Sequence, residues 1–316
     1  GGRGARVAAA LGVIAATGLA DAALADGPSA PPVAPRRPHV VKIGKVPGED
    51  RGSGDLYDPP RELVDDLFWL RDDKRESAEI LDHLRAENAY TEAATAHLAG
   101  FRDKLYKELL SHVQETDSSA PYAHGPYAYY TRTVEGLSYA IHCRRPLRSL
   151  GGEQVVLDEN QVAKEHPDHC DVGAVEPSPD HGVLAWAVDG KGYETYTVHF
   201  TDLASGKPLD DLLEETSGDV VWGADRRTVF YTTFDEAHRP CAVWRHTLGE
   251  AQAQDEKLFE DPDGLFYVSI GKSRDGRLLL ISADSTETSE VHLLELSDRK
   301  GALADLEKGG KSLVRT

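Results

Sequence analysis

The protein has 316 residues, of which 40% are hydrophobic and 28% charged, a composition that supports a buried core and excludes global disorder. Its 54 Asp and Glu residues outnumber 35 Lys and Arg residues, and the net charge of −19 argues against a surface for nucleic acid or for an anionic membrane. The three cysteines lie far apart and form no Cys-x-x-Cys pair, so we expect neither a disulfide framework nor a cysteine zinc site.

Residues 1–40 are predicted to be a disordered leader and linker. Arg3 and Arg6 precede an apolar run over residues 7–20, and Ala23-Leu24-Ala25 offers a small-residue cleavage site. This layout is typical of a secretory signal or of an organellar transit peptide, and the run is shorter than the roughly 20 residues that span a bilayer. The alternative is that residues 1–40 are untranslated or wrongly assigned sequence upstream of a cytoplasmic protein. The sequence therefore does not decide between the cytoplasm and an organelle such as a plastid. Since the chain begins at Gly1 and has no methionine, we expect its natural beginning to be missing.

Residues 41–121 are predicted to form a helical segment. Two stretches place apolar residues three to five positions apart with charged residues between them, the pattern of amphipathic helices. The apolar positions are Ile80, Leu81, Leu84 and Ala89 in the first stretch, and Leu98, Phe101, Leu105 and Leu109 in the second. Each helix needs a partner for its apolar face, and we expect that partner to be the β region or a domain absent from the chain.

Residues 122–316 are predicted to form β-strands, since their sequence pattern is that of strands and no longer that of helices. Runs over residues 127–133 and 137–143, joined by Val134-Glu135-Gly136, indicate a hairpin. Three later units each consist of an aspartate turn, a strand, a polar turn and a second strand. The turn aspartates Asp180, Asp225 and Asp275 are 45 and 50 residues apart, and the strand-closing aspartates Asp189, Asp235 and Asp284 are 46 and 49 apart.

A repeat in the high forties with several short strands is typical of β-propeller blades, each of which needs a neighbour to cover its apolar face. A β-sandwich with accidental spacing is the alternative. Residues 122–316 have room for about four units, the first of them irregular. Because a larger propeller does not close at four such blades, we expect the carboxyl end to be truncated as well.

No motif in the chain assembles a catalytic site. The nucleophile elbow G-x-S-x-G is absent, and Gly52-Ser53-Gly54 has the wrong spacing. Gly271-Lys272-Ser273 resembles the end of a phosphate-binding loop, but Phe266 stands where that loop needs a glycine. The cluster His166-Pro167-Asp168-His169-Cys170 has no second cluster to complete a zinc site, and the adjacent Glu214-Glu215 point apart. We therefore expect no catalytic, cofactor-binding or metal-binding residue in this chain, and no cofactor.

A set of short segments in a fixed order carries a family resemblance. They are residues 68–73 (FWLRDD), 86–90 (AENAY), 105–108 (LYKE), 117–121 (DSSAP), 125–132 (GPYAYYTR), 135–136 (EG), 157–160 (LDEN) and 178–180 (SPD). Over roughly residues 40–316 the chain resembles the amino-terminal half of an oligopeptidase B-like member of the prolyl oligopeptidase family of serine peptidases. The segments at 68–73 and 86–90 favour oligopeptidase B over a prolyl-specific relative.

The resemblance implies a seven-bladed propeller over an α/β-hydrolase domain, which is built from the carboxyl-terminal half and the amino-terminal helical segment. On this reading the chain is mainly β, with about four of the seven blades. The propeller would admit only short peptides to a Ser-Asp-His triad that cleaves after Arg or Lys. The triad and the acidic residues for the basic side chain lie in the half that is absent, so none can be assigned here. The expected partners are the missing hydrolase domain and short basic peptides; a non-catalytic propeller module and a prolyl-specific oligopeptidase are the alternatives.

Overall fold

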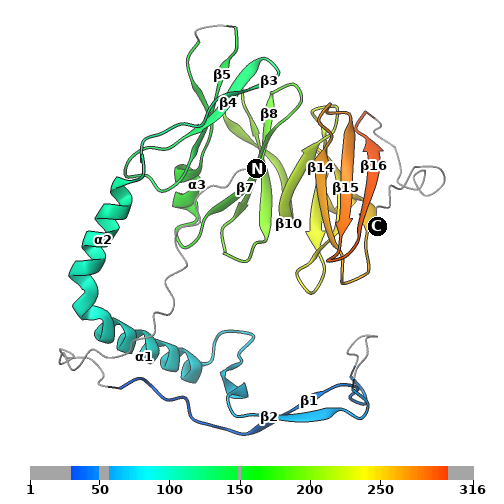
Figure 1. Ribbon diagram of the computed structural model, residues 1–316. Coiled ribbons are helices and arrows are strands. Elements are labelled where there is room, and N and C mark those ends of the chain that lie inside the picture. The colour runs from blue at the N-terminus through cyan, green and yellow to red at the C-terminus, as the bar shows by residue number, and fades with distance from the viewer. Residues whose placement is uncertain (1–29, 50–56, 149–150, 298–316) are drawn as a thin grey trace. The chain divides into compact units, whose positions relative to one another are not determined.

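The computed structural model describes residues 30–49, 57–148 and 151–297 (Figure 1). The chain divides into two compact units, one ending at Val113 and the other beginning at Gln114. Residues 1–29 of the predicted leader lie outside the described residues, and the domain boundaries at residues 40 and 121 stay predictions. Within the described part, no helix combines the length and the apolar character needed to cross a membrane.

The first unit holds one hairpin and the predicted helices. Its elements are β1 (His39–Ile43), β2 (Arg61–Asp65), a 3-10 turn at Phe68–Leu70, α1 (Ala78–Thr95), a 3-10 turn at Ala96–Leu98 and α2 (Ala99–Ser111). Asp72 fixes the start of α1, because its carboxylate accepts the backbone N–H groups of Glu76 and Ser77 at 2.7 and 2.6 Å. Neither helix buries a single residue, and Phe101 is 64% exposed. The apolar face predicted from the sequence is therefore largely exposed on α2, whereas on α1 Ile80 and Leu81 are half-buried.

The second unit begins with a four-stranded antiparallel sheet, the first blade, made of β3 (Tyr122–His124), β4 (Tyr127–Arg132), β5 (Ile141–Pro146) and β6 (Gln154–Asp158), with α3 (Glu159–Glu165) after it. The predicted start of the second long strand at Leu137 is wrong, since β5 begins at Ile141. The side chain of Asn160 bonds both the N–H and the carbonyl of Tyr139 at 3.0 Å. These groups are thereby withdrawn from the strand ladder.

The next two blades share one seven-stranded sheet. Its strands are β7 (Asp171–Pro177), β8 (Val183–Asp189), β9 (Tyr196–Asp202), β10 (Lys207–Trp222), β11 (Thr228–Phe234), β12 (Pro240–Thr247) and β13 (Glu256–Glu260). The long β10 is interrupted where its register with β11 shifts between Thr216 and Val220. Glu215 and Gly218 have φ of 56° and 89° there, and a Cβ on Gly218 would lie 2.9 Å from the Tyr196 ring. The first half of β10 thus closes the second blade and its second half opens the third.

The fourth blade contains β14 (Tyr267–Lys272), β15 (Leu278–Asp284) and β16 (Ser289–Glu295) (Figure 1). As predicted, Asp189 and Asp284 close strands, since β8 ends at Asp189 and β15 at Asp284. The fold is mainly β, and the four successive blades confirm the predicted partial propeller.

Three apolar clusters fill the junctions between consecutive blades. Val183, Ala185 and Ala187 of β8 face the third blade, whereas Leu184 and Val188 of the same strand face the first. The strand alternation sends successive side chains to opposite faces, so one strand supplies two interfaces. A third cluster joins β11 and β12 to the fourth blade. A two-layer sandwich would bury only one face of each sheet, so this alternative is wrong.

The repeated aspartates are explained by turn chemistry. Asp225 accepts the backbone N–H groups of Arg227 and Thr228 at 2.9 and 2.7 Å. Ser178 and Ser273 donate their hydroxyls to Asp180 and Asp275 at 2.7 and 2.6 Å. Each aspartate thereby fixes the turn that leads into the second strand of its blade.

Replacing Asp189 with alanine is expected to lower the free energy of unfolding by about 1–3 kcal/mol, because donors buried at a strand end lose their acceptor. The Asp189 carboxylate is buried and accepts the N–H groups of Lys191, Gly192 and Glu194 at 2.7–2.9 Å. Burial opposes the charge, but these bonds outweigh it and lower the pKa of Asp189. Its contribution is therefore full above the ordinary aspartate pKa of about 3.9 and is lost as the pH falls below it.

Urea unfolding at neutral and at acidic pH measures this effect. Asp284→Ala is the matched control, since Asp284 closes the equivalent strand but is exposed. There the hydroxyl of Ser285 accepts the N–H of Thr288 at 2.9 Å instead. Equal losses for the two variants would contradict the assigned role of Asp189.

Candidate functional site

The first strands of successive blades line a concave channel. β7, the second half of β10 and β14 run along it, and His124 at the end of β3 borders it. The channel encloses a cavity of about 930 Å³. In a propeller the first strand of each blade lies nearest the central axis, so this cavity is the described part of the central passage.

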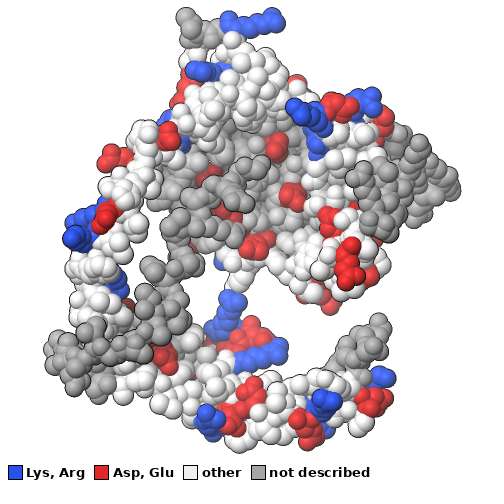
Figure 2. Space-filling view, in the orientation of Figure 1, with Lys and Arg blue, Asp and Glu red and all other residues white. Residues whose placement is uncertain are grey.

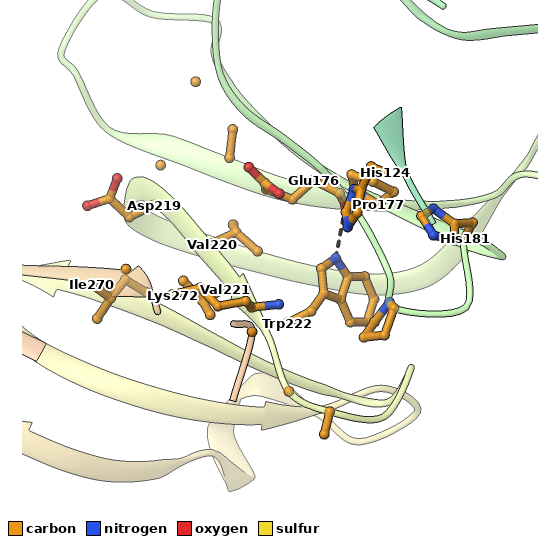
Figure 3. Close-up of a pocket in the computed structure, with 18 of the residues that line it drawn as sticks. His124, Glu176, Pro177, His181, Asp219, Val220, Val221, Trp222, Ile270 and Lys272 are labelled. Atoms are coloured by element: carbon orange, nitrogen blue, oxygen red, sulfur yellow. Dashed lines mark hydrogen bonds between the residues drawn. The ribbon is translucent and has the colours of Figure 1, made fainter. Parts of the chain in front are cut away.

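Three charged side chains from three different strands lie along the cavity: Glu176 on β7, Asp219 on β10 and Lys272 on β14 (Figure 3). All three are open to channel water but surrounded by the concave wall. The wall displaces part of their hydration, which raises the pKa of Glu176 and of Asp219 and lowers the pKa of Lys272. Lys272 and Glu176 partly offset this effect for each other through their opposite charges.

The backbone under these charges is held by a bond between blades. The indole Nε1 of Trp222 donates to the carbonyl of Glu176 at 2.9 Å, which ties β10 to β7 (Figure 3). Ser217, also on the wall, forms a hydrogen bond with Thr232. The channel is thus a polar passage with a fixed wall, and its charges can attract or repel a charged molecule in it because a concave low-dielectric wall concentrates their field.

The wall does not contain the arrangement that acyl transfer needs, which is a nucleophile bonded to a base. Over residues 30–49, 57–148 and 151–297, no serine hydroxyl or cysteine thiol forms a hydrogen bond with a histidine. Cys143, Cys170 and Cys241 are free and buried, and burial raises the pKa of each thiol. The expectation that the chain carries no catalytic residue stays a prediction.

The motifs weighed in the sequence are scattered. Gly271 and Lys272 end β14 in the channel wall, whereas Glu214 and Glu215 lie on β10 beside a different cavity. Gly52-Ser53-Gly54 lies outside the described residues. His166–Cys170 connects α3 of the first blade to β7 of the second. In the part of the chain that the structure describes, no three His, Cys, Asp or Glu residues are placed to hold a metal ion.

Sequence reasoning missed Glu176, Asp219 and Lys272. Each lies three to six residues before the turn aspartate of its unit, on the first strand of a blade. A charged residue in an otherwise apolar first strand was the available signal. On the visible face of the propeller unit, the coloured carboxylates are dispersed and form no single continuous patch, as expected for a solvated acidic surface (Figure 2).

The comparisons with known proteins agree on one family. The profile described as "Prolyl oligopeptidase, N-terminal beta-propeller domain" matches residues 49–312. Dipeptidyl aminopeptidase BI of Pseudoxanthomonas mexicana is 37% identical over 277 residues, which cover 83% of this chain and 36% of that protein.

Two solved structures of oligopeptidase B are also similar. The enzyme from Leishmania major superposes with a TM-score of 0.81 at 40% identity, over 91% of this chain and 39% of that chain. The closed form from Trypanosoma brucei with covalently bound antipain gives a TM-score of 0.79 at 43% identity, with the same coverage of 91% and 39%. The chain therefore spans well under half the length of these relatives.

Proposed function

The chain belongs to the prolyl oligopeptidase family, and from this premise we propose that it forms the propeller part of a serine oligopeptidase that cleaves short peptides after Arg or Lys. In this proposal the blades restrict which substrates reach a catalytic centre supplied by a hydrolase domain outside residues 1–316. The observation that carries the proposal is the channel itself: inner strands of successive blades enclose a polar passage, and the described residues bring no nucleophile to a base.

The bare helices support the same proposal. Leu98, Phe101, Leu105 and Leu109 are 39%, 64%, 36% and 56% exposed, all on predicted apolar positions of the helical unit. Burying a side chain of this size contributes about 1.5–3 kcal/mol, so a matching apolar surface on the hydrolase domain would gain considerably from covering them. An exposed apolar face of this kind is typical of a docking surface, which favours this proposal over a free-standing propeller module.

A chimera tests the proposal. Residues 30–297 replace the corresponding part of Trypanosoma brucei oligopeptidase B, whose own sequence is 43% identical over the matched region. The chimera is expected to hydrolyse a fluorogenic Arg substrate and to react with a fluorophosphonate probe. The chain alone is expected to do neither, because the described residues bring no serine hydroxyl to a histidine base. The parent enzyme is the control.

Two results would contradict the proposal: stoichiometric labelling of the chain alone, or a folded chimera without activity. The preference for Arg or Lys must be tested on the native protein, since the family resemblance implies that the residues which determine it lie outside this chain. The length of the native protein in cells and its activity on Arg, Lys and Pro substrates decide between the proposed function and its alternatives. Cleavage after Pro would favour the prolyl-specific alternative, and an inactive native protein of this length would favour the interaction module.

A further inference from the structure

The turn between β7 and β8 inserts a histidine of the second blade into the first. His181 is 6% exposed and has a φ of 58°, the left-handed region. Its ring fills the space above Gly125, where a Cβ would lie 2.1 Å from the imidazole Nε2. Glycine at position 125 is therefore what allows the ring to enter the first blade.

A chain of hydrogen bonds sets the protonation state of this ring. The Arg144 guanidinium on β5 donates to the carbonyl of His181 at 2.7 Å and to the phenol oxygen of Tyr129 at 3.3 Å. The Tyr129 hydroxyl lies 2.8 Å from the Nδ1 of His181. Because the phenol oxygen accepts a hydrogen bond from Arg144, its own O–H is directed at Nδ1, which accepts that bond as an unprotonated nitrogen. The geometry assigns a neutral His181 that carries its proton on Nε2.

The surroundings disfavour a positive charge on His181. From β3, the His124 ring meets it edge-on at 4.9 Å, and from β4 the Tyr127 ring lies 5.6 Å away under the Arg144 guanidinium. Burial lowers the pKa of His181, and His124 and Arg144 lower it further, whereas Asp180 raises it. The net shift is downward.

Asp180 and Lys272 are the two remaining charged neighbours, and neither would balance a positive charge on His181. The Asp180 carboxylate is engaged by the Ser178 hydroxyl at 2.7 Å and by Arg226 at 3.2 Å. Lys272 of β14 acts on His124, whose pKa is lowered first by burial and then by this lysine. A proton on His181 would therefore face more positive than negative charge.

We propose that His181 is a pH-sensitive latch between the first two blades, closed when its ring is neutral and opened when the ring gains a proton. Protonation turns Nδ1 into a donor. The Tyr129 hydroxyl would then receive donors from both Arg144 and His181 and would lose the acceptor for its own proton, which breaks the chain. The latch is fully closed above the ordinary histidine pKa of about 6.5 and opens as the pH falls below it. The reason is that His181 has a lower pKa in the closed junction than in the open one, so the open junction binds the proton more readily.

Hydrogen exchange on the whole chain tests the latch. Backbone amides of residues 122–132 are followed at about pH 7.5 and about pH 5.5, on either side of the ordinary histidine pKa. In the wild type, exchange corrected for its intrinsic rate is expected to be faster at the lower pH by up to about tenfold, the largest effect that a group with an ordinary pKa of about 6.5 produces one pH unit below it. In His181→Asn most of this difference should be lost, because asparagine tolerates a positive φ but does not titrate, and only the smaller response of His124 remains.

His238→Asn is the matched control, because His238 also has a positive φ, of 61°, but is exposed on a turn of the third blade. It should keep the wild-type response. A wild type without pH response, or a His181→Asn variant that retains the full wild-type response, would overturn the proposal. If His181→Asn fails to fold, ¹⁵N NMR of the wild-type imidazole decides: a protonated Nδ1 at neutral pH, or a pKa at or above the ordinary value, would also overturn it.

Discussion

Replacing His246 with leucine is expected to lower the free energy of unfolding by about 3–5 kcal/mol, the usual result of removing one partner from a buried ionic network. His246 on β12 is fully buried, and its Nδ1 lies 2.7 Å from Asp255 while its Nε2 lies 3.3 Å from Asp211. The Tyr231 hydroxyl donates to the other Asp255 oxygen at 2.8 Å. Leucine fills the space but leaves two carboxylates without the imidazole that bonds both of them.

The pH dependence of this loss is expected to have a definite sign. Burial alone would lower the pKa of His246, but the hydrogen bonds and charges of Asp255 and Asp211 outweigh it and raise that pKa. The stabilisation is therefore full below the ordinary histidine pKa of about 6.5 and is lost as the pH rises through the folded-state pKa. Urea unfolding across this range should show the difference between wild type and His246→Leu shrinking at high pH.

His199→Leu is the matched control for this experiment. His199 is half-buried and stacks on Trp186 at 4.5 Å, and burial lowers its pKa. Its removal is expected to cost about 1 kcal/mol, the value of an aromatic pair, with a pH dependence of opposite sign. An unchanged midpoint for His246→Leu would show that the Asp211–His246–Asp255 network contributes no net stability.

Local sequence pattern was sufficient for most of the propeller. The turn aspartates Asp180, Asp225 and Asp275 located the second strand of the second, third and fourth blades. They can do this because each bonds backbone groups only a few residues away. In the structure, β8 and β11 then send alternate side chains to the two neighbouring blades. These features depend on short-range chemistry, which a single sequence displays.

The features that the sequence did not reveal depend on contacts between distant residues. The start of β5 is displaced by Asn160, which lies 21 residues beyond the backbone it bonds. Asp219 and Lys272 share the channel only because β10 and β14 open successive blades. The Arg144–Tyr129–His181 chain likewise joins two blades across a separation of 52 residues. No local rule predicts such pairs, because they form only when the blades stack.

Trp222→Ala is expected to lower the free energy of unfolding by about 3–5 kcal/mol, since it removes the largest buried side chain at the junction of the second and third blades. The indole is 1% exposed, meets the Phe200 ring edge-on at 6.0 Å and donates to the Glu176 carbonyl at 2.9 Å. Alanine would leave a cavity, and it would also leave that carbonyl without its donor. Urea unfolding followed by far-UV circular dichroism measures the loss without relying on tryptophan fluorescence.

Two further variants separate the two contributions of Trp222. Trp222→Phe keeps most of the apolar volume but removes the donor, so it is expected to cost about 1–3 kcal/mol. Trp244→Ala removes a tryptophan that is only half-buried and bonds Thr233 at 2.8 Å within its own blade, and it should cost less than Trp222→Ala. If Trp244→Ala proved as costly as Trp222→Ala, stability would reside within single blades. A larger loss for Trp222→Ala would show that stacking of one blade on the next supplies it, because Trp222 lies inside the buried cluster at the junction, whereas Trp244 only packs against that cluster.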